Sequence, residues 1–117
     1  MAVPEFVYKV ADSDLFAEAA ERGTFAGAGV DLADGYIHFS TADQLSETLR
    51  RHFAGKTGLT LAAVRTADLG AALRWEPSRG DDLFPHLYAA LPMSAVAWTA
   101  PIAVASDGTA ALPAGVQ

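Results

Sequence analysis

The chain has no cysteine and a shortage of positive charge. Without cysteine it has no disulfide framework and no thiolate-ligated zinc or iron–sulfur site, which fits a cytoplasmic protein. Lys and Arg total 8 against 14 Asp and Glu, giving a net charge of −6. Because an acidic surface repels phosphate backbones, we do not expect nucleic acid as a partner.

Residues 87–106 carry no charged side chain, yet they do not have the pattern of a membrane span. Pro92 and Pro101 interrupt the run, alanine dominates it, and no basic residues flank it. Residues 1–5 lack the basic and apolar regions of a signal peptide. We therefore expect no membrane association and interpret residues 87–106 as buried strands.

The length and composition indicate one globular domain spanning residues 1–117. Hydrophobic residues make up 51% of the 117 positions, which is enough apolar mass for a core. Helical signals come early and strand signals dominate later, which favours the α+β class over regular βαβ units. We find no internal repeat and no low-complexity linker.

In the first half, the pattern predicts two strands, each followed by a helix. Residues 6–10 and 36–39 are predicted strands, rich in aromatic and β-branched side chains. Asp12 or Ser13 is expected to cap the first helix, which ends at Gly23. Residues 24–33 are predicted to be a loop. Ser40 is expected to cap the second helix, with Asp43 completing a capping box.

In the second half, short strands are predicted at residues 58–66, 73–76 and 86–91. A helical turn is expected at residues 67–72 and a polar loop at residues 77–85. Residues 95–105 and 109–112 are predicted to form a hairpin, because the Asp107-Gly108 pair favours a tight turn.

The segment DGYIHFS at residues 34–40 suggests the wall of a cleft. Side chains alternate between the two faces of a strand, so Ile37 and Phe39 point to the core. Tyr36, His38 and Ser40 then share the opposite face. In the structural alternative, His38 is a hydrogen-bonded framework residue and Ser40 is simply a helix cap.

A second group of polar residues surrounds His86. Glu76 ends a predicted strand just before a proline, and Pro85 fixes an extended approach to His86. His86 and Tyr88 share a face if this segment is a strand. Glu76 and His86 are thus candidates for acid and base chemistry near neutral pH. The alternative is a rim ion pair of Glu76 with Arg74 or Arg79, and a histidine that caps a turn.

Other constellations carry less information. His38, His86 and Glu76 are of metal-ligating types, but their spacing matches no short metal motif. No Walker loop, dinucleotide fingerprint or nucleophile elbow occurs. The basic run Arg50-Arg51-His52, with Lys56, is interpreted as a solvated helix face, and His52 as a surface residue.

Several motifs together resemble those of the small bacterial proteins of domain-of-unknown-function family 952. They are Tyr8-Lys9, residues 34–40, Trp75-Glu76 and residues 84–88 (FPHLY). Their order and spacing match the family over nearly the whole chain. Ala89 departs from the pattern, because a glycine usually stands at this position.

The resemblance implies a fold similar to ADP-ribosyltransferases and RNA phosphotransferases. Such a fold is a split, strongly bent β-structure with a cleft for NAD. By position, Tyr8 and Lys9 fall on its first strand, and His38 and Ser40 on the second. The residues implied in or near the cleft also include Tyr36, Glu76, His86, Tyr88 and Trp75.

Three functions are compatible with these observations. The first is a cleft for NAD, ADP-ribose or a related phosphorylated nucleotide, with transferase activity as an extension. The second is a non-catalytic protein-interaction module, because the chain has no Glu-x-Glu pair and no first-strand Arg or His of the kind found in ADP-ribosyltransferases. The third is a metal-assisted hydrolase that uses His38, His86 and Glu76.

Overall fold

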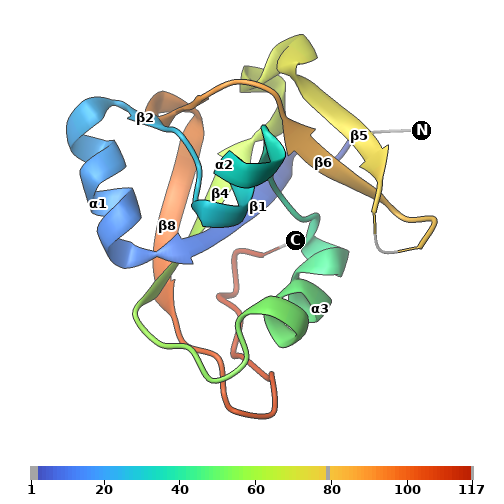
Figure 1. Cartoon of the computed structure of the whole chain (residues 1–117). Coiled ribbons are helices and arrows are strands. Elements are labelled where there is room, and N and C mark those ends of the chain that lie inside the picture. Colours follow the sequence, from blue (N-terminus) through green and yellow to red (C-terminus); the bar gives the residue numbers. More distant parts are fainter. Residues whose placement is uncertain (1–2, 79, 117) are drawn as a thin grey trace.

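A computed structural model of the chain describes residues 3–78 and 80–116. These residues form three α-helices, eight short or medium β-strands and three 3₁₀ turns (Figure 1). In chain order they are β1 (Phe6–Asp12), α1 (Ser13–Arg22), β2 (Thr24–Phe25), α2 (Gly29–Asp34), β3 (Ile37–His38), α3 (Ala42–His52), β4 (Leu59–Arg65), η1 (Thr66–Asp68), η2 (Gly70–Ala72), β5 (Leu73–Pro77), β6 (Leu83–Leu87), β7 (Leu91–Pro92), η3 (Met93–Ala95) and β8 (Val96–Ile102). The α+β prediction is confirmed.

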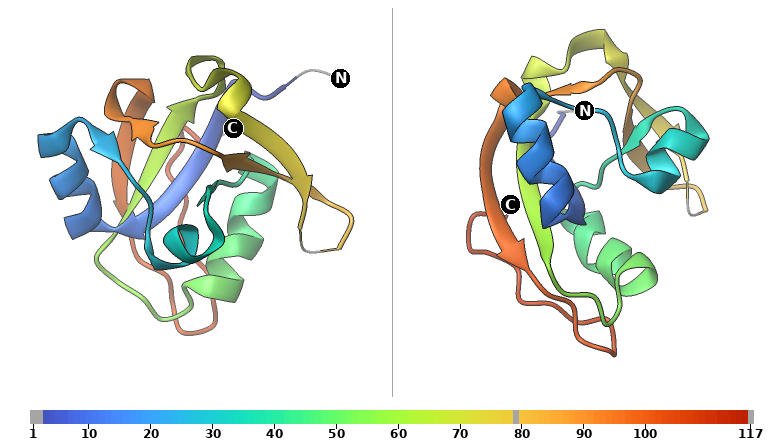
Figure 2. Two further views of the ribbon diagram at one scale, coloured as in Figure 1. Left: turned by 45° about the horizontal axis from the view of Figure 1, so that its top comes forward. Right: turned by 60° about the vertical axis from the view of Figure 1, so that its left-hand side comes forward.

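The strands form separate antiparallel sheets. One has the order β1-β4-β8, another β3-β6-β5, and β2 pairs with β7. The right-hand view of Figure 2 shows β5, β6 and α2 standing to one side of the β1-β4-β8 sheet. Tyr8 and Ser40 join the two larger sheets, since each backbone N–H donates to the other residue's carbonyl at 2.8 and 2.9 Å.

Strand alternation on β1 distributes its side chains between two apolar clusters. Val7 and Ala11 belong to a cluster that includes Phe16 of α1, while Tyr8 and Val10 belong to one that includes Leu45 of α3. Lys9 lies between Val7 and Ala11 in the sequence and shares their face. A lysine is thus placed on the same face of the β1-β4-β8 sheet as Val7 and Ala11.

The first predicted helix is confirmed, but its predicted cap is not. No side chain caps α1, and the Ser13 hydroxyl instead lies 2.7 Å from that of Thr60 on β4. Gly23 ends the helix as predicted, with φ of 87° and an N–H that donates to the Ala19 carbonyl.

The prediction of a loop at residues 24–33 is wrong, because this segment contains β2 and α2. Helix α2 lacks the apolar periodicity that would have revealed it, and its single buried residue is Asp31. The described residues thus hold a third helix beside the two that the sequence predicted.

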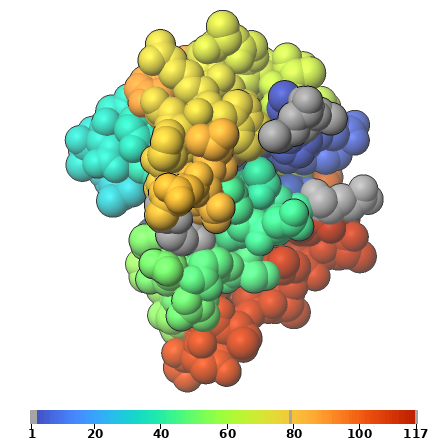
Figure 3. Space-filling model, turned by 90° about the vertical axis from the view of Figure 1, so that its right-hand side faces the viewer, coloured from blue at the N-terminus to red at the C-terminus, as the bar shows by residue number. Residues whose placement is uncertain are grey.

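The cap of α3 is one residue later than predicted. The Gln44 N–H donates to the Thr41 hydroxyl, and the Gln44 side chain accepts from the Thr41 N–H, so the capping box is Thr41 and Gln44. The Ser40 hydroxyl instead forms a hydrogen bond with the Thr48 hydroxyl, and the two oxygens are 2.8 Å apart. Figure 3 shows α3 (green) below the β5–β6 hairpin (yellow) on one face of the molecule.

In the second half, β4 and β5 match the predicted strands closely, whereas β6 begins and ends earlier than the strand predicted at residues 86–91 and shortens the predicted loop. The predicted hairpin at residues 95–112 is wrong in part. The turn forms, with the Gly108 N–H donating to the Ala105 carbonyl at 2.9 Å, but residues 109–112 are not a strand. Among the described residues, no helix has the length and apolarity to cross a membrane.

Candidate functional site

The two histidines singled out by the sequence are neighbours in the β3-β6-β5 sheet. His38 on β3 pairs with His86 on β6, and their ring centroids are 5.3 Å apart. Ile37 and Phe39 are buried in the core, as alternation predicted. Antiparallel pairing therefore brings together two imidazoles that are far apart in the sequence.

The ring of His38 lies between two carboxylates of α2. Its Nδ1 atom is 2.6 Å from Asp31 and its Nε2 atom is 3.0 Å from Asp34. The backbone N–H of His38 also donates to Asp31 at 3.0 Å. Both ring nitrogens of His38 therefore have a carboxylate partner on α2.

Asp31 also neutralises Lys9, whose Nζ atom lies 2.8 Å from Asp31 Oδ2. Burial by itself would raise the pKa of Asp31. Hydrogen bonds from His38 and Lys9 and the charge of Lys9 outweigh burial and hold this pKa at about 2. Burial is the main influence on Lys9 and lowers its pKa, against the opposing effect of Asp31. Asp31 is therefore ionised at neutral pH.

His86 has its own carboxylate partner. Its Nδ1 atom lies 2.8 Å from Glu76 Oε1, and the Tyr88 hydroxyl donates to the same oxygen at 2.7 Å. The hydrogen bond from Tyr88, followed by that of His86, lowers the pKa of Glu76. His86 is buried, so Glu76 fixes the orientation of its ring.

The structure does not show the ion pair between Glu76 and Arg74 that the alternative interpretation of the sequence considered. The Arg74 guanidinium lies over the Tyr88 ring, 4.6 Å from its centroid. Arg79, the other partner considered, lies outside the described residues. Among the described residues, the hydrogen-bond partners of the Glu76 side chain are His86 and Tyr88.

Tyr36 packs against both histidines. Its ring centroid lies 4.6 Å from that of His38, 4.3 Å from that of His86 and 5.1 Å from that of Tyr88. Burial raises the pKa of Tyr36, and the charges of Asp34 and Glu76 add to this effect. The tyrosine thus packs against the rings of both carboxylate–histidine pairs.

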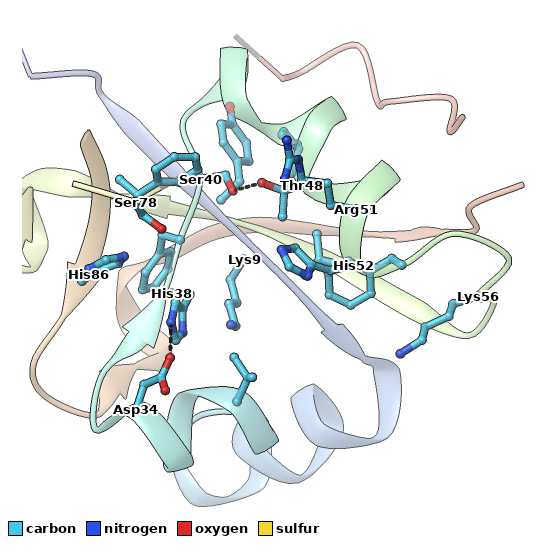
Figure 4. Close-up of a pocket in the computed structure, with 17 residues that line it drawn as sticks. Lys9, Asp34, His38, Ser40, Thr48, Arg51, His52, Lys56, Ser78 and His86 are labelled. Carbon is cyan, nitrogen blue, oxygen red and sulfur yellow. Dashed lines mark hydrogen bonds and ion pairs between the residues drawn. The ribbon is translucent and has the colours of Figure 1, made fainter. Parts of the chain in front are cut away.

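A cavity of about 650 Å³ opens beside these pairs (Figure 4). Residues of β1, α2, β3, α3 and β6 and of the loops beside them form its wall. They are Tyr8, Lys9, Val10, Val30, Asp34, His38, Phe39, Ser40, Leu45, Thr48, Arg51, His52, Phe53, Lys56, Ser78, Phe84 and His86. In Figure 4, Lys9 lies centrally, with His38 and His86 to one side and His52 and Lys56 to the other.

The cavity gathers some of the predicted site residues and leaves others outside. Tyr8, Lys9, His38, Ser40 and His86 line it. The remaining predicted residues are not among those that line it. Tyr36, Glu76 and Tyr88 contact the lining histidines or one another, whereas Trp75 packs against the hydrophobic core.

The sequence missed the basic side of the cavity. Arg51, His52 and Lys56 are exposed, as expected, but they also line the cavity opposite His38 and His86. Arg51 is partly neutralised, since its Nε atom lies 2.8 Å from Glu47. Nothing in the local pattern of α3 shows which part of the protein this face meets.

The geometry does not assemble the metal site considered from the sequence. In the part of the chain that the structure describes, no three His, Asp or Glu side chains are grouped so that they could hold a metal ion. Carboxylates of α2 engage both nitrogens of His38, and Glu76 engages Nδ1 of His86.

The chain is similar to protein CC0527 from Caulobacter crescentus. The sequence in the crystal structure of CC0527 is 40% identical to this chain. The two structures superpose with a TM-score of 0.86, and the match covers 91% of this chain and 93% of that chain. Its solution NMR structure gives 41% identity and a TM-score of 0.78 over 90% of each chain. No curated protein matches this sequence. The profile of one family, described as "Protein of unknown function (DUF952)", matches residues 10–99, and the chain therefore belongs to that family.

Proposed function

We propose that the cavity binds a phosphorylated nucleotide of the NAD or ADP-ribose class. The observation that carries the proposal is the concentration of lysine, arginine and histidine side chains in one cavity of an acidic protein. The chain has a net charge of −6, yet both of its lysines, Lys9 and Lys56, and all three of its histidines line this one cavity. Positive groups that converge on a concave surface favour an anionic ligand.

The size and the remaining lining fit such a ligand. A volume of about 650 Å³ lies within the usual range for small-molecule sites. Arg51 adds a guanidinium, which suits phosphate oxygens, and Phe53 and Phe84 offer apolar surface for a base or sugar. Asp34 is the carboxylate among the lining residues.

The proposal includes the similarity to the ADP-ribosyltransferase fold that the family motifs imply. Two features support it: the β-structure is divided into two larger sheets, and the cavity lies at their junction. Tyr8 and Ser40, whose backbones join the sheets, both line the cavity. A cytoplasmic location, expected from the cysteine-free sequence, belongs to the same proposal.

Transferase activity is the proposed extension of binding. In the proposed reaction, the bond between nicotinamide and ribose breaks, nicotinamide leaves with the electron pair, and an acceptor hydroxyl bonds to the ribose carbon. The acceptor proton passes to a histidine. His86 is the preferred base because it is buried beside the cavity and oriented by Glu76.

The test of binding is an NMR titration of the ¹⁵N-labelled chain with ADP-ribose, NAD and adenosine. We expect ADP-ribose and NAD to shift the resonances of His38, Ser40 and His86, and adenosine, which lacks phosphate, to shift them much less. Unchanged resonances at millimolar ADP-ribose and NAD would overturn the proposal and favour the protein-interaction module.

To test catalysis, the chain is incubated with NAD, and the nicotinamide released is measured by chromatography. We expect the wild-type chain to release it and His86→Ala to lose most of the activity while still binding ADP-ribose. Binding without release by the wild-type chain would confine the function to ligand recognition.

A further inference from the structure

Helix α2 is anchored mainly by charge. Its single buried residue is Asp31, whereas the apolar side chains of Val30 and Leu32 are each 65% exposed. A surface helix is usually held by an apolar stripe that faces the core. The position of α2 over the cavity therefore depends on the polar contacts that Asp31 and Asp34 make with Lys9 and His38.

The two aspartates of α2 are held very differently. Asp31 accepts hydrogen bonds from the Ala28 and His38 backbones and contacts both Lys9 and the His38 ring, and its side chain is 1% exposed. Asp34 contacts His38 Nε2 at 3.0 Å, and its side chain is 47% exposed. Asp34 can rotate into water at little cost, whereas Asp31 cannot leave without stranding the buried Lys9.

Asp34 also occupies the place where an anion would meet His38. Figure 4 shows its carboxylate against the His38 ring at the edge of the cavity. The other charged or titratable groups around this position are three. They are Lys9, which is paired with Asp31, Tyr36, whose ring packs against that of His38, and His86, whose ring lies 5.3 Å from that of His38. Arg51, His52 and Lys56 lie across the cavity.

From this arrangement we infer that Asp34 is an internal competitor which the phosphate group of the ligand displaces from His38 Nε2. The inference rests on the proposed function and adds a basis for specificity. A phosphate or diphosphate carries more charge and more acceptor oxygens than the Asp34 carboxylate. The phosphate group can therefore replace this carboxylate at His38 Nε2. A neutral nucleoside or a monocarboxylate gains nothing by the exchange and is rejected.

The direct test compares the affinity of Asp34→Asn and wild type for inorganic pyrophosphate, by calorimetry at low salt. The asparagine side chain is nearly isosteric with aspartate but carries no charge, so we expect about two- to fivefold tighter binding. Asp14→Asn is the matched control, because Asp14 is an exposed aspartate in the first turn of α1 and its loss changes the net charge equally. We expect its affinity to stay close to that of wild type.

A second measurement uses the wild-type chain and does not depend on the folding of a variant. With ¹³C-labelled aspartate, saturating pyrophosphate should shift the carboxyl signal of Asp34 and leave that of Asp31 nearly unchanged. Binding of pyrophosphate with an unmoved Asp34 signal, or equal affinities of the Asp34→Asn and Asp14→Asn chains, would overturn the displacement alone. Failure of every chain to bind pyrophosphate would overturn the nucleotide cavity as well.

Discussion

The Nζ atom of Lys9 lies 2.8 Å from Oδ2 of Asp31, and the two side chains are 8% and 1% exposed. Lys9 lies on β1 in the β1-β4-β8 sheet, and Asp31 lies on α2, a helix that buries no apolar side chain. This ion pair therefore joins α2 to the sheet and places Asp34 against His38. The shape of the cavity depends on it.

Replacing Asp31 by Asn should destabilise the fold. The substitution leaves Lys9 buried without a counterion, and breaking a buried pair in this way costs about 3–5 kcal/mol. Urea denaturation measures the loss, with Asp14→Asn as an exposed control that should cost less than about 0.5 kcal/mol. A loss for Asp31→Asn as small as that of the control would show that the pair does not anchor α2.

The same residue predicts how stability depends on pH. The pKa of Asp31 is about 2 in the folded chain, below its ordinary value of 3.8. A lowered carboxyl pKa adds stability that is present above about pH 4 and is lost as pH falls toward about 2. For Asp31 this contribution to the free energy of unfolding is about 2 kcal/mol. The free energy of unfolding, measured in urea between about pH 5 and pH 2.5, should therefore fall more steeply for wild type than for Asp31→Asn. Parallel curves for the two chains would rule out this contribution.

Local patterns predicted the parts of the site that depend on one segment. Alternation over residues 36–40 predicted that His38 and Ser40 share a face away from Ile37 and Phe39, and both line the cavity. The sequence could not show the pairing of His38 with His86, because register between distant strands is set by tertiary packing. It did indicate both residues as candidates.

The features that the sequence missed have a common physical origin. Helix α2 has no apolar face, so hydrophobic periodicity cannot detect it, and its anchor is an aspartate. The basic side chains at the end of α3 look like a solvated face because they are exposed. Their orientation toward His38 depends on how α3 packs on β1 and the β3-β6-β5 sheet, which no local pattern encodes.

Two glycines with similar positive φ angles should respond differently to replacement by alanine. Gly23 and Gly108 have φ of 87° and 90°, which costs a residue with a Cβ atom about 1 kcal/mol at either position. A Cβ atom at Gly23 meets nothing within 4 Å, but at Gly108 it would lie 2.5 Å from Arg50 Cγ and 3.0 Å from Arg50 Cα. We expect Gly108→Ala to lower the unfolding free energy by about 1–3 kcal/mol more than Gly23→Ala. Equal losses in thermal or urea denaturation would show that the turn can move away from α3.

Removing the Tyr88 hydroxyl should raise the pKa of Glu76. The hydrogen bond from Tyr88 is the main cause of the lowered pKa, and His86 contributes less. Tyr88→Phe removes that bond and leaves the His86 contact intact. An NMR titration of the Glu76 carboxyl carbon measures the change. Tyr36→Phe serves as the control, since Tyr36 contacts the same rings but its hydroxyl is not a cause of the lowering. A Glu76 pKa that is the same in all three chains would exclude the role of Tyr88.

The basic side of the cavity can be tested with one lysine. Lys56 is exposed, lines the cavity and lies 5.6 Å from the centre of the Phe53 ring, so its ammonium group can reach a bound anion without being needed for the fold. Lys56→Ala should weaken ADP-ribose binding about three- to tenfold at low salt, and the difference should shrink as salt is added.

The matched control for Lys56→Ala is Arg22→Ala. Arg22 is an exposed cation on α1 that pairs with Glu18 and does not line the cavity, and its loss changes the net charge of the chain equally. If ADP-ribose binding depends on the local field of the cavity, Arg22→Ala should bind like wild type. Equal weakening in both variants would mean that the ligand responds to overall charge, and the basic residues opposite His38 and His86 would then have no specific role.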